Sequence, residues 1–403
     1  MSGRKAYVVG TADTKAAELC YVRDLIAAAG QETVLVNVGI QGGEEGVDVT
    51  AAEVAACHSE GPVAVFVNDR GQAVVEMAHA LTAFLQGRDD IGGIIGLGGS
   101  GGSGIIAPAM QALPIGTPKV LVSTLASGDV SAYVGASDVN MFHPVTDVSG
   151  LNRISRRLLG NAAHAMAGMM QFKISVVQDD RPAVVLSMFG VTTAAVQMIT
   201  EGLEDRFDCL VFHATGNGGR SMEQLISQGD VTGVLDITTT EICDLLTGGF
   251  LSAGEERLDS IAQTKLPYVG SCGALDMANF WGPETVPAQF KDRQFYHHNA
   301  QVTLMRATPE DSAQIGAWIG EKLNKCDGPV RFLLPLRGVS ALDIQGGPFH
   351  NPAASNALFN ALRATVVQTR DRQLVELDMH INDPAFAEAA ISNFNEIYEQ
   401  KGD

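Results

Sequence analysis

The stretch Asp89–Leu113, DDIGGIIGLGGSGGSGIIAPAMQAL, decides the fold of this chain. The apolar run Gly93–Leu97 has the length and character of a buried strand, and the apolar residues of Ile105–Leu113 are typical of a helix. Between them, five of the seven residues Gly98–Gly104 are glycine. Glycines adopt positive φ angles at little steric cost, and a helix N-terminus carries roughly half a positive charge. The stretch therefore predicts a strand, an anion-binding loop and a helix, with phosphate as the usual anion.

The glycine loop matches neither common phosphate-binding motif in full. No G-K-[ST] follows it, which excludes a Walker A loop, and Gly96, Gly98 and Gly101 match G-x-G-x-x-G only loosely. The alternative is a tight turn between strand and helix that binds nothing. We favour the bound anion, because so many glycines lose more backbone entropy on folding than a turn requires.

Strand and helix patterns alternate on both sides of this stretch. Between the first two expected strands, a helical apolar pattern begins after Asp13, which stands at the N-cap position, and ends before Gly30. Such alternation predicts parallel sheets with helices on both faces. We therefore expect an α/β fold made of two Rossmann-like, doubly wound domains with mainly parallel sheets and a cleft between them.

The expected elements divide into two halves. Strands are expected at Ala6–Val9, Thr33–Val38, Val63–Val67, Gly93–Leu97 and Lys119–Val122, and then at Ala183–Met188, Asp208–His213, Gly233–Ile237, Tyr268–Gly270, Arg331–Leu334 and Leu374–Met379. Helices of the second half are expected at Thr192–Asp205, Arg220–Gln228, Thr239–Leu246, Pro309–Asn324, Pro352–Thr365 and Pro384–Glu399. The stretch Leu151–Met170 is expected to close the first domain as a helix, and the polar turn Gln178–Pro182 opens the second. We therefore predict a nucleotide-binding domain at residues 1–180 and a second domain, with a candidate substrate site, at residues 181–403.

The composition limits the partners and the compartment. The formal net charge of −19 disfavours nucleic acid and acidic membranes, so an anion must be held by local devices. Six cysteines without C-x-x-C spacing fit a reducing compartment. No run reaches the ~18 apolar residues of a membrane span, and the N-terminus is too short and polar for a signal peptide. We expect a cytoplasmic protein that binds no nucleic acid and no membrane.

Polar residues follow other expected strands of the first half. Thr11, Asp13 and Thr14 come after the first strand, and Ser123 and Thr124 come after the fifth. Ligands of open α/β folds bind at the carboxyl ends of the strands, so these residues are candidates for contacts beside the glycine loop. Arg70, in Asp69-Arg70-Gly71, is a candidate phosphate ligand. In the alternative interpretations, Thr11 and Asp13 only cap a helix and Arg70 is an ordinary surface arginine.

Several motifs in a fixed order resemble a known family. They are G-T-A-D-T-K at Gly10–Lys15, G-L-G-G-S-G-G-S-G at Gly96–Gly104, F-H-A-T-G-N-G-G-R at Phe212–Arg220, L-D-I-T-T-T-E at Leu235–Glu241 and L-P-L-R-G-V-S at Leu334–Ser340. They resemble the bacterial uncharacterised proteins related to the ATP-binding N-terminal domain of the tomato mosaic virus resistance protein. The resemblance covers essentially the whole chain. The plant protein has a further C-terminal barrel domain that this sequence lacks, so its antiviral activity is not transferred.

The resemblance implies ATP as the ligand of the first domain and self-association into a dimer or larger homo-oligomer. The nucleotide contacts that it implies are Thr11, Asp13, Thr14, Arg70, Gly98, Gly99, Ser100, Gly101, Gly102, Ser123 and Thr124. Mg²⁺ is expected with ATP, and Asp13 is its candidate ligand, directly or through water.

The second half also places polar residues at strand ends. The candidate catalytic residues are His213, Asp276, Arg337 and His350, with His380 as a further candidate base. The glycines between His213 and Arg220 predict a second anion site ahead of a helix. Other patterns have plainer interpretations: Thr238 and Glu241 match a capping box, Cys272 fits a buried inert thiol better than a nucleophile, and His297 and His298 point apart on a strand.

The leading hypothesis is an ATP-binding metabolic enzyme. In it, the first domain holds Mg-ATP, and a small anionic substrate binds across the cleft. A nucleotide-dependent sensor or interaction protein without turnover is the first alternative. The second is an ATP-independent lyase or hydrolase that acts on a sugar-acid or phosphorylated substrate.

Overall fold

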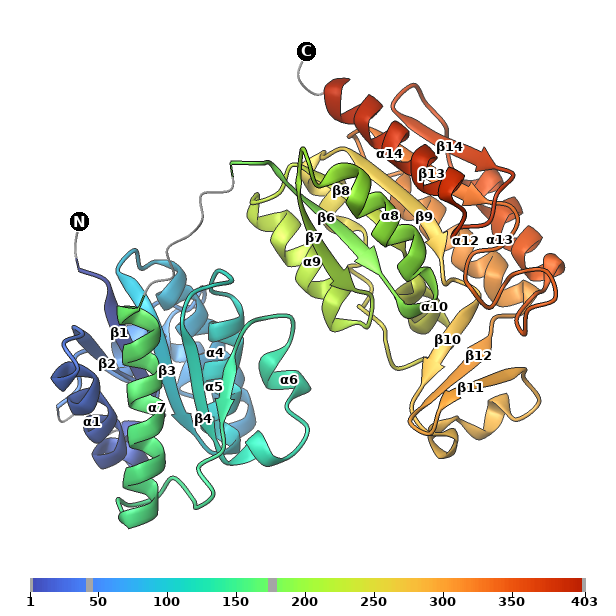
Figure 1. Ribbon diagram of the computed structural model, residues 1–403. Coiled ribbons are helices and arrows are strands. Elements are labelled where there is room, and N and C mark those ends of the chain that lie inside the picture. Colours follow the sequence, from blue (N-terminus) through green and yellow to red (C-terminus); the bar gives the residue numbers. More distant parts are fainter. Residues whose placement is uncertain (1–2, 41–45, 173–179, 401–403) are drawn as a thin grey trace. The chain divides into compact units, whose positions relative to one another are not determined.

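The computed structural model describes residues 3–40, 46–172 and 180–400 (Figure 1). The chain divides into two compact units, Met1–Val177 and Gln178–Asp403, and each is described by itself. The turn Gln178–Pro182, at which we placed the domain boundary, lies partly outside the described residues.

The first unit is built on a five-stranded parallel sheet with the order β2-β1-β3-β4-β5. The strands are β1 (Lys5–Gly10), β2 (Thr33–Asn37), β3 (Ile91–Gly98), β4 (Lys119–Ser123) and β5 (Asn140–Phe142). Alternate residues of β1 face opposite sides. Tyr7 and Val9 join the core formed with α4 and α5, whereas Ala6 and Val8 join the core formed with α1 and α7. The sheet is therefore covered on both faces, as its apolar strands require.

The helices of the first unit follow the strands in turn. They are α1 (Ala12–Ala28), α2 (Ala51–Ala55), α3 (Pro62–Val65), α4 (Arg70–Gln86), α5 (Ser100–Gln111), α6 (Ser131–Val134) and α7 (Arg153–Gln171), with a 3₁₀ turn η1 (Thr124–Ser127) after β4. Helix α7 lies beside α1, and α4 lies beside α5 (Figure 1).

The second unit repeats this plan on a six-stranded parallel sheet with the order β14-β13-β9-β8-β6-β7. Its strands are β6 (Ala183–Met188), β7 (Asp208–His213), β8 (Gly233–Thr238), β9 (Tyr268–Gly273), β13 (Val330–Pro335) and β14 (Arg372–Leu377). Helices α8 (Thr193–Leu203) and α14 (Pro384–Glu399) pack on one face. The other face carries α9 (Asn217–Gln228), α10 (Thr240–Thr247), α11 (Asp259–Thr264), α12 (Pro309–Leu323) and α13 (Pro352–Thr365). The predicted α/β class with two mainly parallel sheets is confirmed.

A small antiparallel sheet interrupts the second unit, and the sequence analysis missed it. Its order is β10-β12-β11, formed by β10 (Met277–Phe280), β11 (Phe295–Asn299) and β12 (Val302–Arg306). The remaining short elements of this unit are the 3₁₀ turns η2 (Gly190–Thr192), η3 (Pro283–Thr285) and η4 (Ala288–Phe290). The edge strand β5 of the first unit was also missed.

Two predicted elements are wrong. Val63–Val67 is not a strand, because Pro62 opens the helical turn α3 after Gly61, which has a positive φ of 78°. Arg70 consequently follows a helix and is the first residue of α4. Helix α5 begins at Ser100 rather than at Ile105, so most of the expected glycine loop is the first turn of a helix.

The predicted caps of two helices are wrong as well. Thr11, and not Asp13, occupies the N-cap position of α1, and no side chain caps that helix. The N-cap of α10 is Thr239, again without a capping side chain, so Thr238 and Glu241 form no capping box.

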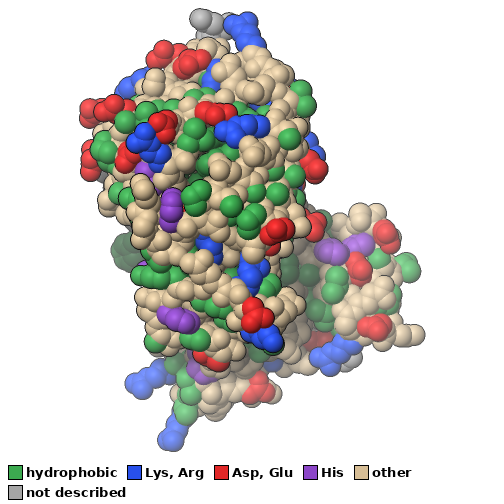
Figure 2. All heavy atoms as spheres, turned by 90° about the vertical axis from the view of Figure 1, so that its right-hand side faces the viewer, with side chains coloured by type: hydrophobic (Ala, Val, Ile, Leu, Met, Phe, Trp, Pro, Cys, Tyr) green, Lys and Arg blue, Asp and Glu red, His purple; other side chains and the backbone are tan. Residues whose placement is uncertain are grey.

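Acidic and basic side chains are interspersed on the face shown in Figure 2, so the negative charge is not gathered into one patch there. In the described part of the chain, no helix combines the length and the apolar character that crossing a bilayer requires.

Candidate functional site

The topology of the first sheet predicts where a ligand binds. Strand β1 lies between β2 and β3, so the helices that follow β1 and β3 leave the sheet on opposite faces. Open α/β sheets bind ligands at this point, beside the carboxyl ends of the two strands. Helix α1 starts two residues after β1 ends, and α5 starts two residues after β3 ends. The motifs Gly10–Lys15 and Gly96–Gly104 therefore both lie at this switch point of the strand order.

The N-terminus of α5 presents backbone N–H groups of the kind that can bind an anion. The first N–H groups of a helix have no partner within the helix, and no side chain caps α5 at its N-cap Gly99. A Cβ added to Gly98 would lie 2.5 Å from the backbone nitrogen of Ser103, so only glycine allows the helix to pack against the end of β3. The helix end is thus held rigidly with its N–H groups uncapped.

Arg70 and Thr124 lie beside this helix end. A Cβ built on Gly101 would be 4.0 Å from Nη2 of Arg70, and one built on Gly99 would be 4.0 Å from Oγ1 of Thr124. Arg70 is exposed, and its guanidinium has no hydrogen-bond or ion-pair partner in the described part of the chain. The structure therefore brings these predicted residues together around one helix terminus.

Ser123 has a different place from the one we expected. It is fully buried, and its hydroxyl group bonds to Oγ of Ser103 at 2.7 Å and accepts from the backbone N–H of Leu125 at 3.1 Å. These contacts join the end of β4 to α5. Ser123 thus supports the loop, and its hydroxyl group is not presented to a ligand.

The residues at the N-terminus of α1 form the second part of the candidate site. The hydroxyl oxygens of Thr11 and Thr14 are 2.9 Å apart, and among the described residues Oδ1 of Asp13 is buried without a hydrogen-bond partner. Asn37, which the sequence analysis did not single out, is fully buried at the end of β2. Its Oδ1 accepts from the backbone N–H groups of Ala12 at 2.9 Å and of Gly39 at 2.8 Å. Asn37 therefore fixes the first turn of α1 against the loop after β2.

The second predicted anion site is filled by the chain itself. Helix α9 begins at Asn217, three residues before the expected start at Arg220, so Gly218 and Gly219 lie in its first turn. Oε1 of Glu241 accepts from the backbone N–H of Gly216 at 2.6 Å and of Gly219 at 3.0 Å. This buried carboxylate thus occupies the position of the expected anion, which explains why Glu241 is unavailable to cap α10.

Arg257 neutralises this buried carboxylate. The guanidinium is 1% exposed and donates to Glu241 at 3.0 Å, to both oxygens of Asp236 at 2.7 Å and to Glu223 at 3.1 Å. Burial raises the pKa of Glu241 above its usual range, and Arg257 opposes that rise. The sequence carried no local signal of this cluster, because its members are distant along the chain.

Within the described residues, no direct contact joins the side chains of the four predicted catalytic residues. His213 is exposed at the end of β7, with its ring centroid 5.3 Å from that of Phe189, and partial burial lowers its pKa. Asp276 is buried. Oδ2 of Asp276 accepts from Ser340 at 2.8 Å, its Oδ1 has no hydrogen-bond partner among the described residues, and burial raises its pKa to about 7. Asp276 is too deep to meet a substrate in this conformation.

The remaining candidates are either engaged or isolated. Arg337 forms a two-point contact with the carboxylate of Asp378, with nitrogen–oxygen distances of 2.8 and 2.7 Å. His380 is buried, with its Nε2 2.9 Å from the carbonyl oxygen of Ser340 and its Nδ1 accepting from the N–H of Asn382. The imidazole of His350 is exposed and makes no hydrogen bond or ion pair with the described part of the chain. Cys272 is fully buried, and burial raises its pKa, as expected for an inert thiol.

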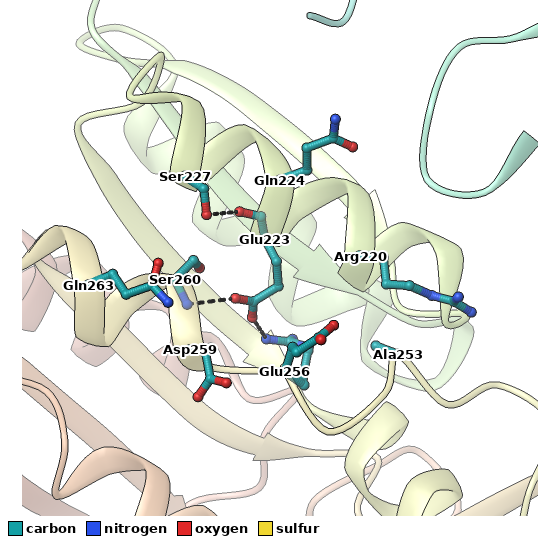
Figure 3. Close-up of a pocket in the computed structure, with 10 residues that line it drawn as sticks. Arg220, Glu223, Gln224, Ser227, Ala253, Glu256, Asp259, Ser260 and Gln263 are labelled. Carbon is teal, nitrogen blue, oxygen red and sulfur yellow. Dashed lines mark hydrogen bonds and ion pairs between the residues drawn. The ribbon is translucent and has the colours of Figure 1, made fainter. Parts of the chain in front are cut away.

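A pocket of about 340 Å³ lies in the second unit between α9 and residues 253–263 (Figure 3). Two of its three acidic side chains, Glu223 and Asp259, are already paired. Glu223 accepts from the backbone N–H groups of Leu258 and Ser260, and Asp259 pairs with Lys322 at 2.6 Å. None of the predicted catalytic residues lines this pocket.

Known proteins resemble the chain over its whole length. The model of the N-terminal domain of the uncharacterised protein family UPF0261 matches residues 4–175, and that of its C-terminal domain matches residues 181–398. A UPF0261 protein of Rhizobium meliloti is 55% identical over 395 residues, which cover 98% of this chain and 99% of the relative. One from Clostridium tetani is 44% identical and covers 95% and 96%.

A plant relative and a solved structure also match. The ToMV resistance protein Tm-1 of Solanum lycopersicum is 39% identical over 419 residues, which cover 98% of this chain and 56% of the plant protein. A dinucleotide-forming acetyl-coenzyme A synthetase of Ca. Korarchaeum cryptofilum, solved with phosphate and ADP, is 12% identical and covers 100% of this chain and 67% of its own. Its TM-score of 0.24 is too low for any inference about this chain. The resemblance stated from the motifs is confirmed, and the chain belongs to the uncharacterised protein family UPF0261.

Proposed function

We propose that residues 1–180 form a nucleotide-binding domain that holds the phosphates of ATP at the N-termini of α1 and α5. The observation that carries the proposal is the N-terminus of α5, which no side chain caps, with the guanidinium of Arg70 beside it, unpaired among the residues that the structure describes. Backbone N–H groups and one arginine are the devices with which an acidic protein can hold an anion locally.

The neighbouring residues suit a polyphosphate better than a single small anion. Helix α5 and the first turn of α1 both begin at the switch point, and a kink at Lys15 separates that turn from the rest of α1, so α5 offers the full positive helix end and α1 adds a short turn beside it. Thr124 beside Gly99, and Thr11 with Thr14, add hydroxyl groups that can donate to phosphate oxygens. ATP, rather than another polyphosphate, is proposed from the family resemblance of these motifs.

Asp13 fits the metal that accompanies ATP. Its Oδ1 is buried at the start of α1 without a hydrogen-bond partner among the described residues, and a carboxylate oxygen is a ligand that Mg²⁺ prefers. Mg²⁺ would neutralise phosphate charge next to a carboxylate that otherwise repels it. We therefore propose Asp13 as the residue that holds Mg²⁺, directly or through water.

The second unit bears on what becomes of the nucleotide. An enzyme acting on a small anionic substrate remains the leading hypothesis, with His213 as the accessible base. A second candidate, a nucleotide-dependent sensor or interaction protein without turnover, is favoured by the state of the expected catalytic groups. Glu241 fills the expected anion site, Asp378 engages Arg337, and Asp276 is buried.

Calorimetric titration with ATP and Mg²⁺ tests the proposal. The matched variant is a double substitution, Gly99→Val and Gly101→Val. Neither glycine has a positive φ, and an added Cβ has 4.0 Å of clearance at both positions. The variant should therefore fold with an unchanged melting temperature and lose ATP binding. Equal affinities of the folded variant and the wild type would refute the phosphate site.

A turnover assay separates the two candidate functions. Release of ADP from ATP in the presence of small carboxylate or phosphorylated metabolites, and its loss on His213→Ala, would support the enzyme. Saturable ATP binding without any release of ADP over hours would support the sensor.

A further inference from the structure

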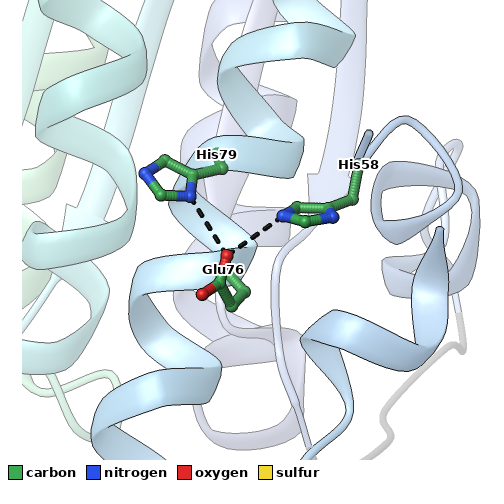
Figure 4. Close-up of side chains that lie close together, drawn as sticks. All are labelled: His58, Glu76 and His79. Atoms are coloured by element: carbon green, nitrogen blue, oxygen red, sulfur yellow. Dashed lines mark hydrogen bonds and ion pairs between the residues drawn. The ribbon is translucent and has the colours of Figure 1, made fainter. Parts of the chain in front are cut away.

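Three side chains with metal-binding atoms meet on the outside of the first unit, away from the glycine motifs (Figure 4). His58 lies on the turn that follows α2, and Glu76 and His79 lie on α4. Glu76 and His79 are three residues apart, so the helix presents them on one face. Their ligand atoms and that of His58 all lie within 4.8 Å of one another.

The geometry suits one shared ion. Nε2 of His58 is 3.0 Å, and Nδ1 of His79 is 3.1 Å, from the same carboxylate oxygen of Glu76. Zinc bonds to nitrogen and oxygen are about 2.0–2.1 Å long, so tetrahedral ligands stand roughly 3.3 Å apart. The two nitrogen–oxygen pairs are already close to this spacing, and the two imidazole nitrogens, which lie within 4.8 Å of each other, can approach it by rotation of the exposed His79 side chain.

We propose that His58, Glu76 and His79 bind a divalent transition-metal ion, with Zn²⁺ as the representative. Two imidazoles and one carboxylate select zinc, cobalt or nickel over magnesium and calcium, which prefer oxygen ligands alone. Three protein ligands leave a position for water, and the side chain of His79 is 65% exposed, so that position faces solvent.

The protonation of the His58 ring allows a metal ion to replace its hydrogen bond to Glu76. Nδ1 of His58 accepts from the backbone N–H of Glu60 at 3.1 Å, so in the metal-free state the ring carries its proton on Nε2 and donates to Glu76. A metal ion on Nε2 requires the other tautomer, with the proton on Nδ1. The hydrogen bond from Glu60 is then lost, but Glu60 is exposed, so water can accept from its N–H.

The carboxylate of Glu76 is in the ionised form that binds a metal ion. Hydrogen bonds from His79 and from His58 lower the pKa of Glu76, so it is ionised near pH 7 and needs to release no proton. The acidic chain as a whole also attracts cations. Binding would fasten the turn at residues 56–60 to α4, and this site does not depend on the proposed nucleotide.

Cobalt titration of the tag-free, chelator-treated full chain tests the site. Co²⁺ should give one saturable set of visible absorption bands per chain at micromolar metal, and Zn²⁺ should abolish them. His79→Ala and Glu76→Gln should each weaken Co²⁺ binding at least tenfold, because even partners behind the ligands contribute tenfold or more. The matched control is His164→Ala, which removes an exposed histidine from α7.

Two results would overturn the proposal. One is wild-type protein without saturable Co²⁺ binding, or with binding that His79→Ala leaves unchanged; this variant alters an exposed side chain and should fold. The other involves Cys57, the exposed thiol next to His58. Cys57→Ser should leave the titration unchanged, and loss of binding in this variant would show that a thiolate, not the three residues, holds the metal.

Discussion

Replacing Arg70 by alanine should weaken ATP binding without harming the fold. Nη2 of Arg70 lies 4.0 Å from the position of a Cβ on Gly101, at the uncapped end of α5. Two unit charges ~4 Å apart attract by ~1 kcal/mol in bulk water and by ~4 kcal/mol at the effective dielectric constant of a protein surface. Because Arg70 is exposed, we expect a loss of about 1–2 kcal/mol, a Kd roughly 5–30-fold weaker.

The fold should survive because the Arg70 guanidinium has no hydrogen-bond or ion-pair partner in the described ranges of the chain. Helix α4 is capped by Asp69, whose carboxylate accepts from the backbone N–H of Gln72 at 2.9 Å, and the substitution leaves that bond intact. The assay is isothermal titration of ATP with Mg²⁺ and, separately, of adenosine. Arg70→Ala should weaken ATP only, because adenosine carries no phosphate. Arg23→Ala on α1, which removes an arginine paired with Asp24, is the matched control and should change neither.

Two results would refute this reasoning. If Arg70→Ala binds ATP as tightly as the wild type does, the guanidinium does not face the phosphates. If the variant weakens adenosine and ATP equally, Arg70 acts on the fold or on the base, and the electrostatic argument is wrong.

Three further predictions concern stability. Gly98→Ala places a Cβ 2.5 Å from the backbone nitrogen of Ser103, so it should lower the free energy of unfolding by about 1–3 kcal/mol. Gly99→Ala should leave the stability unchanged. Equal melting temperatures of the two variants in differential scanning calorimetry would contradict this prediction. Arg257→Met leaves several buried carboxylates without their cation and should lower the free energy of unfolding by about 3–5 kcal/mol in urea titrations; a loss below ~1 kcal/mol would contradict the structure. Burial raises the pKa of Asp244 to about 7 in the folded protein. Protonation of this carboxyl therefore contributes to the stability of the fold fully below the pKa of the unfolded chain, and this contribution is lost as the pH rises through 7. Wild-type stability should thus fall by roughly 1 kcal/mol from pH 6 to pH 8 through this residue, and Asp244→Asn should flatten the profile; identical profiles would refute the assignment.

Regular, locally encoded features were predictable from the sequence. The strands β6 and β7 and the helices α13 and α14 have the bounds that were expected, because apolar patterns and helix-starting prolines mark them within a few residues. The strand predicted at residues 63–67 is wrong because its five residues fit a strand or a helical turn equally well, and Pro62 starts a helical turn there.

The strand and the helix on either side of the glycine motif were predicted, but the conformation of the motif itself was not. Glycine disfavours a helix interior, so the sequence indicated a loop up to Gly104. The structure starts α5 at Ser100 instead, since packing against β3 outweighs the weak propensity of a few glycines. The proposed anion site changes little, because the N–H groups of a first helical turn can bind an anion as the N–H groups of a loop can.

Long-range polar contacts were beyond sequence reasoning. Glu241 has the spacing of a capping residue, but its carboxylate bonds to Gly216 and Gly219, more than twenty residues earlier. Asn37 similarly holds α1 from the end of β2. No local pattern reports such pairs, because the folded sheet brings them together.

Hydrogen exchange of the full chain with and without ATP and Mg²⁺ tests the central claim most directly. The first N–H groups of α5 have no partners within the helix and should exchange quickly in the free protein, whereas Asn37 and Thr11 already accept from the N–H groups of Ala12, Thr14 and Lys15 in α1. If phosphates bind at α5, ATP should slow exchange in the peptide covering residues 98–104, and leave residues 216–220 unchanged. Saturating ATP that slows exchange only in the second unit, or nowhere near this helix end, would contradict the account.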